Sequence, residues 1–145
     1  MGDTRPWAVI AGGGTAGHVS PGLAVAEEIV HRGVPRDAVR WIGSRRGLEA
    51  ELVPAAGFAL TALPGRGIQR RLTLANVGAV IGLVAAVVRA VVGFARQRPA
   101  VLVALGGYAS VAGVIAAAVW RVPIVITEQN AVPSLANRLA ARVAR

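Results

Sequence analysis

Two side chains with acid–base chemistry directly follow predicted strands. His18 ends a glycine-rich segment that follows the short apolar run Trp7–Ala11, and Glu128 follows the apolar run Ile124–Thr127. An imidazole can accept a proton near neutral pH, whereas a carboxylate can orient an imidazole, bind a hydroxyl group or act as the base itself. A lone histidine can also simply hydrogen-bond its own loop. His18 and Glu128 are therefore the candidate catalytic residues, and the sequence leaves open which of them is the base.

The glycine-rich segment before His18 has the position of an anion-binding loop. Between a strand and a helix, glycines let the backbone approach a phosphate and turn amide N–H groups toward it. The candidate ligand-binding residues in this first loop are Gly14, Thr15, Ala16 and Gly17.

The same loop allows a second interpretation. Gly12, Gly14 and Gly17 fit the pattern G-x-G-x-x-G of dinucleotide-binding domains. The second strand ends without a carboxylate for a ribose, but Arg45 and Arg46 could bind the extra phosphate of NADP. An NADP-dependent oxidoreductase domain is thus the alternative function, whereas a P-loop is excluded because the chain contains no lysine.

A second glycine loop repeats this arrangement after the predicted strand Val101–Leu105. Its candidate binding residues are Gly106, Gly107, Tyr108 and Ser110. Either pair of glycines could merely permit a tight turn. Two such loops in one domain favour one extended anion, such as a diphosphate, bound between them.

Apolar runs and helical periodicity alternate along the whole chain. The patterns predict five strands at Trp7–Ala11, Ala38–Gly43, Phe58–Leu63, Val101–Leu105 and Ile124–Thr127, and helices at Pro21–Arg32, Leu48–Ala56, Leu72–Ala95, Ser110–Trp120 and Leu135–Arg145. Parallel strands need such crossover helices. We therefore expect one Rossmann-like, doubly wound α/β domain over residues 1–145, with its ligand beyond the carboxyl ends of the strands.

The amino-acid composition limits the kinds of binding partner. The 16 basic residues, all arginine, exceed the 7 acidic ones, which gives a net charge of +9 and favours a polyanion, whether an anionic membrane surface or a phosphorylated molecule. Aromatic residues make up only 4% of the chain, so single-stranded nucleic acid is a poor fit. The absence of cysteine agrees with a reducing cytoplasm, and the scarcity of histidine argues against a bound metal. The first residues carry no visible export signal.

One long apolar segment raises the question of membrane contact. Leu74–Val88 contains no charge, and Arg89 interrupts the run before the roughly 20 residues of a membrane span. A core helix, an interfacial helix and a true span all remain open. Arginines surround this segment at positions Arg66, Arg70, Arg71, Arg89, Arg96 and Arg98. We expect Arg70, Arg71, Arg89 and Trp120 to contact an anionic membrane surface.

These motifs resemble a known family, the undecaprenyldiphospho-muramoylpentapeptide N-acetylglucosaminyltransferases of glycosyltransferase family 28. The similarity spans essentially the whole chain. It is carried by the segment Gly13–Ala24, by Gly43-Ser44, by Gly106-Gly107-Tyr108, and by Glu128-Gln129-Asn130 with Asn137. The sequence departs from the family at Ala16, where a glycine is usual, and an alanine methyl group narrows the room for a phosphate and disfavours positive φ.

The resemblance implies a fold and a reaction. Such enzymes are inverting GT-B transferases with two Rossmann-like domains, of which this chain resembles the amino-terminal, acceptor-binding one. They transfer N-acetylglucosamine from UDP-N-acetylglucosamine to the C4 hydroxyl of lipid I, without a cofactor, at the cytoplasmic face of the membrane as peripheral proteins. The family places Asn130 against the donor. For Asn137 we expect a surface position on the last helix. If nothing follows Arg145, we expect no catalysis by this chain alone, and a non-catalytic membrane-associated binding module is the third possibility.

Overall fold

The computed structural model describes residues 5–64 and 74–144. Five strands form one sheet in the order β3-β2-β1-β4-β5, and every neighbouring pair is parallel. The strands are β1 (Ala8–Gly12), β2 (Val39–Ser44), β3 (Ala59–Leu63), β4 (Val101–Gly106) and β5 (Ile124–Ile126). The helices are α1 (Ala16–His31), the 3-10 helix η1 (Arg36–Ala38), α2 (Glu49–Ala55), α3 (Leu74–Arg96), α4 (Tyr108–Val119) and α5 (Leu135–Ala140). The predicted doubly wound α/β fold is confirmed.

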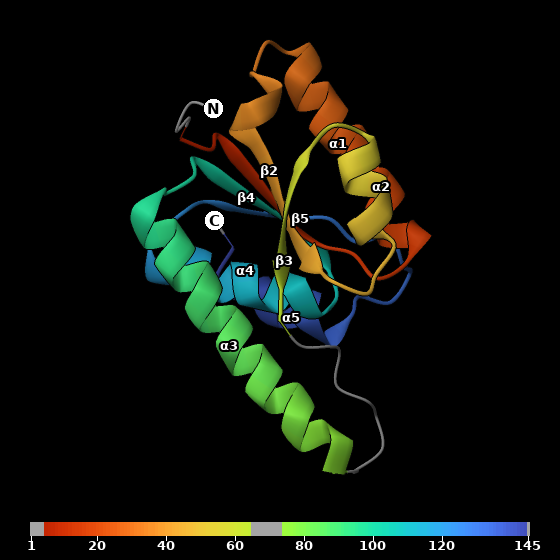
Figure 1. Cartoon of the computed structure of the whole chain (residues 1–145), viewed down its shortest axis with the longest axis vertical. Helices are drawn as coiled ribbons and strands as arrows, with labels where there is room; N and C mark the ends of the chain where they lie inside the picture. Colours follow the sequence, from red (N-terminus) through yellow and green to blue (C-terminus); the bar gives the residue numbers. More distant parts are fainter. Residues whose placement is uncertain (1–4, 65–73, 145) are drawn as a thin grey trace.

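The helices cover both faces of the sheet, as Figure 1 shows. Successive side chains of a strand point to opposite faces, so each strand feeds two cores. In β1, Val9 and Ala11 pack in the cluster under α3, α4 and α5, whereas Ile10 packs in the cluster under α1 and α2. The central strands are therefore apolar on both sides, which explains their continuous apolar runs.

The strand order places one pair of loops at the centre of the sheet edge. The chain runs outward from β1 through β2 to β3, then crosses back to β4 on the other side of β1. The loops that follow β1 and β4 consequently start from adjacent strands and lead to helices on opposite faces. This reversal point is where doubly wound sheets bind ligands.

Two predicted helix boundaries were wrong. The first helix begins at Ala16 rather than at Pro21, which lies inside α1. The last helix ends at Ala140 instead of continuing to the end of the chain. Beyond it the amides of Arg142 and Val143 bond to carbonyls three residues back, which is 3-10 geometry. The other boundaries differ by one or two residues.

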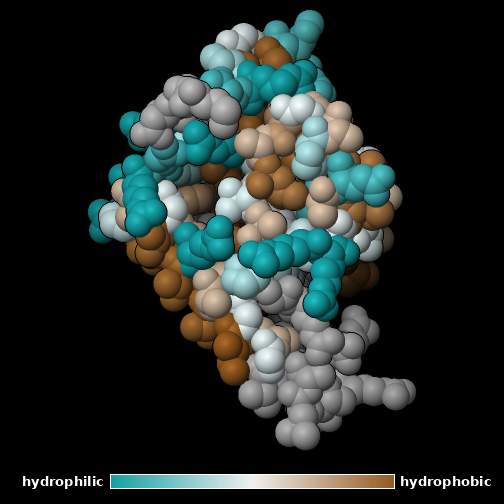
Figure 2. All heavy atoms as spheres, in the orientation of Figure 1, coloured by the Kyte–Doolittle hydropathy of each residue, from teal (hydrophilic) through white to brown (hydrophobic). Residues whose placement is uncertain are grey.

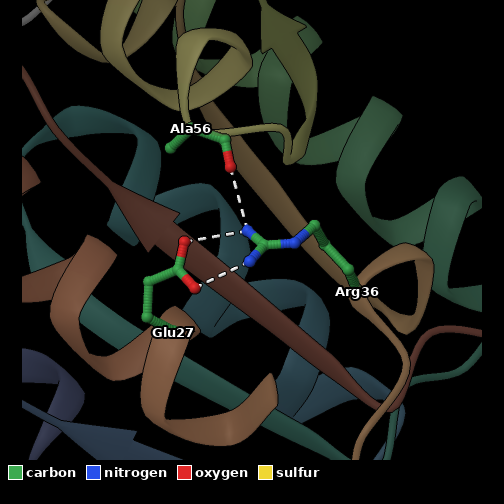
Figure 3. Close-up of polar contacts among 3 residues, drawn as sticks. All are labelled: Glu27, Arg36 and Ala56. Carbon is green, nitrogen blue, oxygen red and sulfur yellow. Dashed lines mark hydrogen bonds and ion pairs between the residues drawn. The ribbon is translucent and has the colours of Figure 1, made fainter. Parts of the chain in front are cut away.

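Arg36 connects three elements on the α1 and α2 side of the sheet (Figure 3). Its guanidinium donates two hydrogen bonds of 2.8 Å to the carboxylate of Glu27 in α1 and one of 2.9 Å to the carbonyl of Ala56 after α2. It also lies 4.6 Å from the centre of the Phe58 ring. The hydrogen bonds from Arg36 lower the pKa of Glu27. This network connects the second half of α1 to the carboxyl-terminal end of α2.

Two glycines provide a matched test of the packing. A Cβ added to Gly22 in α1 would lie 2.5 Å from both Leu105 Cδ1 and Trp41 Cη2, whereas one added to Gly93 in α3 would meet nothing within 4 Å. We expect Gly22→Ala to lower the free energy of unfolding by about 1–3 kcal/mol through overpacking. Gly93→Ala should raise it by about 0.5–1 kcal/mol, because alanine is the better helix former. Urea unfolding measures both, and equal stability of the two variants would contradict the packing described.

Candidate active site at the carboxyl ends of β1 and β4

The two glycine loops touch each other through their backbones. A Cβ on Gly12 would lie 2.6 Å from the carbonyl oxygen of Gly106, and one on Gly107 would lie 3.2 Å from that of Gly13. Gly12 and Gly107 also have positive φ values of 137° and 79°, which glycine adopts most easily. The predicted juxtaposition of the two loops is confirmed. Part of their glycine content serves loop contact and backbone geometry.

A cavity of about 370 Å³ opens where the two loops meet. Of the predicted binding residues, Gly14, Thr15, Gly107 and Tyr108 line it, together with His18. Its remaining lining residues are Gly13, Ser44, Arg46, Gly47, Glu49 and Ala109. Among the described residues, no group of three or more His, Asp or Glu side chains is placed to hold a metal ion. The lining combines glycine backbone and hydroxyl groups with one imidazole, one arginine and the Glu49 carboxylate.

The other predicted residues lie outside that lining. Ala16 and Gly17 are exposed in the first turn of α1, whereas Gly106 and Ser110 are buried. Because Ala16 is the first residue of α1 and positive φ values fall on Gly12, Gly13 and Gly14, the alanine causes no backbone strain. The departure from the family pattern is thus compatible with the loop.

His18 lies in the first turn of α1 with its imidazole facing the second loop. Its Nδ1 is 3.0 Å from Thr15 Oγ1, and its Nε2 would be 3.3 Å from a Cβ built on Gly106. When Nδ1 carries the proton and donates to Thr15, Nε2 has a free lone pair. That tautomer can accept a proton from a hydroxyl group in the cavity.

Glu128 is saturated by hydrogen bonds from its own loop. One carboxylate oxygen accepts from the backbone and side-chain amides of Asn130, at 3.0 and 2.8 Å. The other accepts from the Ser134 amide and from Asn137 Nδ2, both at 2.9 Å. These bonds, the Ser134 amide above all, lower the pKa of Glu128 to about 2. Such a weakly basic carboxylate is a poor general base at neutral pH, so the geometry favours His18 for that role.

Asn137 is buried, and the expected surface position was wrong. It is 3% exposed, and its Nδ2 donates to the Thr127 carbonyl and to Glu128, each at 2.9 Å. The same Nδ2 would lie 3.6 Å from a Cβ on Gly106, the point that His18 Nε2 also approaches. Its buried Oδ1 has no hydrogen-bond partner within the part of the chain that the structure describes. Asn137 therefore connects the Glu128 loop to the second glycine loop.

Asn130 and Tyr108 are both engaged within the protein. The side chain of Asn130 is exposed and folds back onto Glu128. The hydroxyl of Tyr108 donates to the carbonyl of Pro64, after β3, and burial raises the pKa of that phenol. Tyr108 thus ties the start of α4 to the end of β3 while its side chain lines the cavity.

Sequence reasoning missed Glu49 as a cavity residue, and it considered Arg46 only together with Arg45, as part of an NADP site. Glu49, the first residue of α2, is 1% exposed and accepts hydrogen bonds from the amides of Gly14 and Ser44. The amide of Gly14, which we had predicted to bind a phosphate, is therefore already paired. Arg46 lines the cavity and its neighbour Arg45 does not, a distinction that no sequence pattern indicated.

Comparison with known proteins identifies the family. Residues 8–145 match the glycosyltransferase family 28 N-terminal domain, and the chain belongs to this family. That membership replaces the NADP-dependent oxidoreductase alternative.

Particular relatives share one name. The chain is 44% identical over 142 residues to the UDP-N-acetylglucosamine–N-acetylmuramyl-(pentapeptide) pyrophosphoryl-undecaprenol N-acetylglucosamine transferase of Alkalilimnicola ehrlichii, covering 98% of this chain and 39% of the relative. It is 40% identical to the protein of that name from Myxococcus xanthus, covering 94% of this chain and 36% of the relative. The chain thus spans less than half the length of these curated relatives.

Solved structures agree on the fold. The crystal structure of Acinetobacter baumannii MurG superposes with a TM-score of 0.81 at 28% identity, over 97% of this chain and 40% of that one. A UDP-N-acetylglucosamine 2-epimerase superposes with a TM-score of 0.61 at 13% identity, over 97% of this chain and 39% of that one, and shares the fold alone.

The low pKa of Glu128 predicts a pH-dependent stability. Its folded-state pKa of about 2 lies below the ordinary value of 4.5, so the stabilisation is complete above pH 4.5 and disappears as the pH falls to about 2. We expect Glu128→Gln to be less stable than the wild type at pH 6, with the difference shrinking toward pH 2. Urea unfolding across this range measures it, with Glu51→Gln in α2 as the control. A constant difference from pH 6 to pH 2 would contradict the assignment.

Proposed function

We propose that this chain forms the acceptor-binding side of an N-acetylglucosaminyltransferase that acts on a lipid-linked muramyl-pentapeptide diphosphate. The proposal rests on the name of its relatives and above all on one observation: His18 projects into a cavity bounded by both glycine loops. A sugar diphosphate carries an anion and a reactive hydroxyl group on one molecule. The cavity offers a cation and a helix amino terminus for the first, and an imidazole for the second.

The reaction we propose is an inverting displacement. The C4 hydroxyl oxygen of the acceptor sugar attacks the anomeric carbon of the N-acetylglucosamine residue while the bond to UDP breaks. His18 Nε2 takes the hydroxyl proton, and UDP leaves with the bonding electron pair. Thr15 accepts the Nδ1 hydrogen bond that keeps Nε2 available. Glu128 holds the side chain of Asn130, which we propose meets the donor sugar.

Arg46 and the start of α4 are the groups we assign to the acceptor diphosphate. Arg46 lines the cavity and carries the positive charge that we assign to the diphosphate. Gly107 is the N-cap of the 12-residue α4, whose first amides and helix dipole favour an anion at that end. A diphosphate bound between them would hold the sugar that it carries beside His18.

Ligand titrations test this function. Calorimetry with a short-chain lipid I analogue should show binding to the 145-residue chain, and NADPH should give no heat of binding. Arg46→Ala should weaken binding of the lipid I analogue about tenfold, because a hydrogen bond to a charged group contributes about 1.5–3 kcal/mol. The exposed neighbour Arg45 provides the matched control, and Arg45→Ala should bind like the wild type.

Two outcomes would contradict the proposal. Tight NADPH binding would indicate a dinucleotide site. An equal loss of affinity in the two arginine variants would mean that general positive charge, rather than the cavity, attracts the ligand. If the chain binds the lipid I analogue but His18 contributes nothing to sugar transfer, the third possibility remains, a non-catalytic binding module.

We further propose that α3 places this domain on an anionic membrane surface as a peripheral protein of the cytoplasmic face. Gly78–Arg96 is long and apolar enough to cross a membrane by length and composition, yet only 22% of it is buried within the protein. One side of α3, including Ala86, Ala90 and Phe94, packs into the core. The opposite side of α3 is exposed in this domain, which supports an interfacial helix over a helix of the core alone.

The exposed side of α3 forms an apolar stripe, visible along the lower left edge of Figure 2. Its exposed residues recur at helical spacing and include Ile81, Val84, Val88 and Val92. Trp120, 37% exposed at the end of α4, donates its indole N–H to the Val91 carbonyl and extends this surface. Arg89 is an exposed cation on the same helix, whereas Arg66, Arg70 and Arg71 lie outside the described residues. An apolar stripe beside cations suits the interface of an anionic bilayer.

Vesicle flotation tests membrane contact. The chain should float with phosphatidylglycerol-containing vesicles at low salt, and Val84→Asp should abolish flotation because it places a charge in the middle of the stripe. Ala24→Asp adds the same charge to an exposed site on α1, across the sheet, and should float like the wild type. Failure of the wild-type chain to float at low salt, or an equal loss in both variants, would contradict contact through α3.

A further inference from the structure

Glu49 places a buried carboxylate directly behind the first glycine loop. The side chain belongs to the first residue of α2 and is 1% exposed. Its Oε2 accepts from the Gly14 amide at 2.7 Å, and its Oε1 accepts from the Ser44 amide, also at 2.7 Å. One carboxylate therefore joins the loop after β1 to the end of β2.

Three glycines form a close-fitting cage around this carboxylate. A Cβ on Gly13, Gly43 or Gly47 would come within 2.3, 2.6 and 2.1 Å of Glu49 side-chain atoms. Gly13 belongs to the loop after β1, whereas Gly43 and Gly47 belong to the end of β2 and the turn that follows it, and each leaves room for the same side chain. Such close packing on all these sides allows the carboxylate little freedom to move.

The hydrogen bond that fixes Gly14 also affects the position of His18, because only Thr15 lies between the loop and the His18 ring contact. Thr15, the next residue, is the N-cap of α1, and its Oγ1 lies 3.0 Å from His18 Nδ1. Gly14 has a φ of 95° and would otherwise have the wide conformational freedom of glycine. Its hydrogen bond to Glu49 selects one position of the loop, and the hydrogen bond between Thr15 and Nδ1 then orients the imidazole.

We propose that Glu49 is a positioning residue for His18. Its carboxylate acts as an internal anion that fixes the first glycine loop through the Gly14 amide, so that Thr15 holds the imidazole with Nε2 toward the second loop. The inference deepens the proposed function, since it takes His18 as the group that removes the acceptor proton. It also explains why the Gly14 amide belongs to the protein and not to the ligand.

An isosteric substitution at Glu49 replaces one of its two acceptor oxygens by a donor. Glu49→Gln keeps the volume of the side chain but leaves a single acceptor oxygen, while its NH₂ group must face one of the two backbone N–H groups. Either Gly14 or Ser44 then loses its hydrogen bond, and two donors face each other. The matched control is Glu51→Gln, which removes the same charge at an exposed site on the same helix.

Nitrogen NMR of the two histidines in the 145-residue chain provides the readout. In Glu49→Gln we expect the ratio of the two neutral tautomers of His18 to change by about twofold or more, because the partner of one ring nitrogen sets the tautomer. His31, exposed at the end of α1, serves as the internal reference and should not change. Glu51→Gln should leave both histidines as in the wild type. An unchanged His18 tautomer ratio in a folded Glu49→Gln variant would overturn the proposal.

A second variant tests the proposal if Glu49→Gln does not fold. Gly47→Ala pushes a methyl group against the Glu49 carboxylate without altering its charge, and it should change the His18 tautomer ratio as Glu49→Gln does. An unchanged His18 tautomer ratio in a folded Gly47→Ala variant would refute the proposal. None of these measurements needs a substrate, so they can fail or succeed independently of the titrations with lipid I analogue.

Discussion

The close approach of the loops after β1 and β4 is the constraint on which the site depends. The backbone at Gly12 leaves no room for a Cβ beside the Gly106 carbonyl, and Gly107 is similarly close to Gly13. The parallel pairing of β1 with β4 at the centre of the sheet brings the loops to this distance, and their glycines permit it. Any side chain there would separate the loops and with them His18 from the start of α4. The sheet order thus determines which residues can share a ligand.

Much of this arrangement follows from periodicity alone. The apolar runs locate all five strands, and alternation with helices predicts the parallel sheet. The edge at which to look for a ligand then follows from the reversal of strand order. His18 and the second glycine loop could be chosen in this way because they follow strands directly, where the fold itself brings distant segments together.

The parts that escaped prediction depend on side-chain direction rather than on element order. Glu49 looked like an ordinary charge in the first turn of a short helix, and only the coordinates show that it turns inward between two backbone amides. Asn137 looked like a surface residue because asparagine is polar, yet its side chain is buried and its amide donates to the loop that contains Thr127 and Glu128. Arg45 and Arg46 are chemically identical neighbours, and the turn after β2 directs one of them into the cavity. A periodicity argument has no information on such directions.

The distribution of hydrogen bonds divides the polar groups into supports and reactive groups. Among the residues that the structure describes, Glu128 accepts four hydrogen bonds and Glu49 accepts two, all from backbone amides and asparagine side chains. Each carboxylate thereby fixes a loop, and in doing so Glu128 loses basicity. His18 is different, because Thr15 engages one ring nitrogen and the other faces the second loop. Loops held by anions, with an imidazole between them, would set the position of the base that we propose before any ligand arrives.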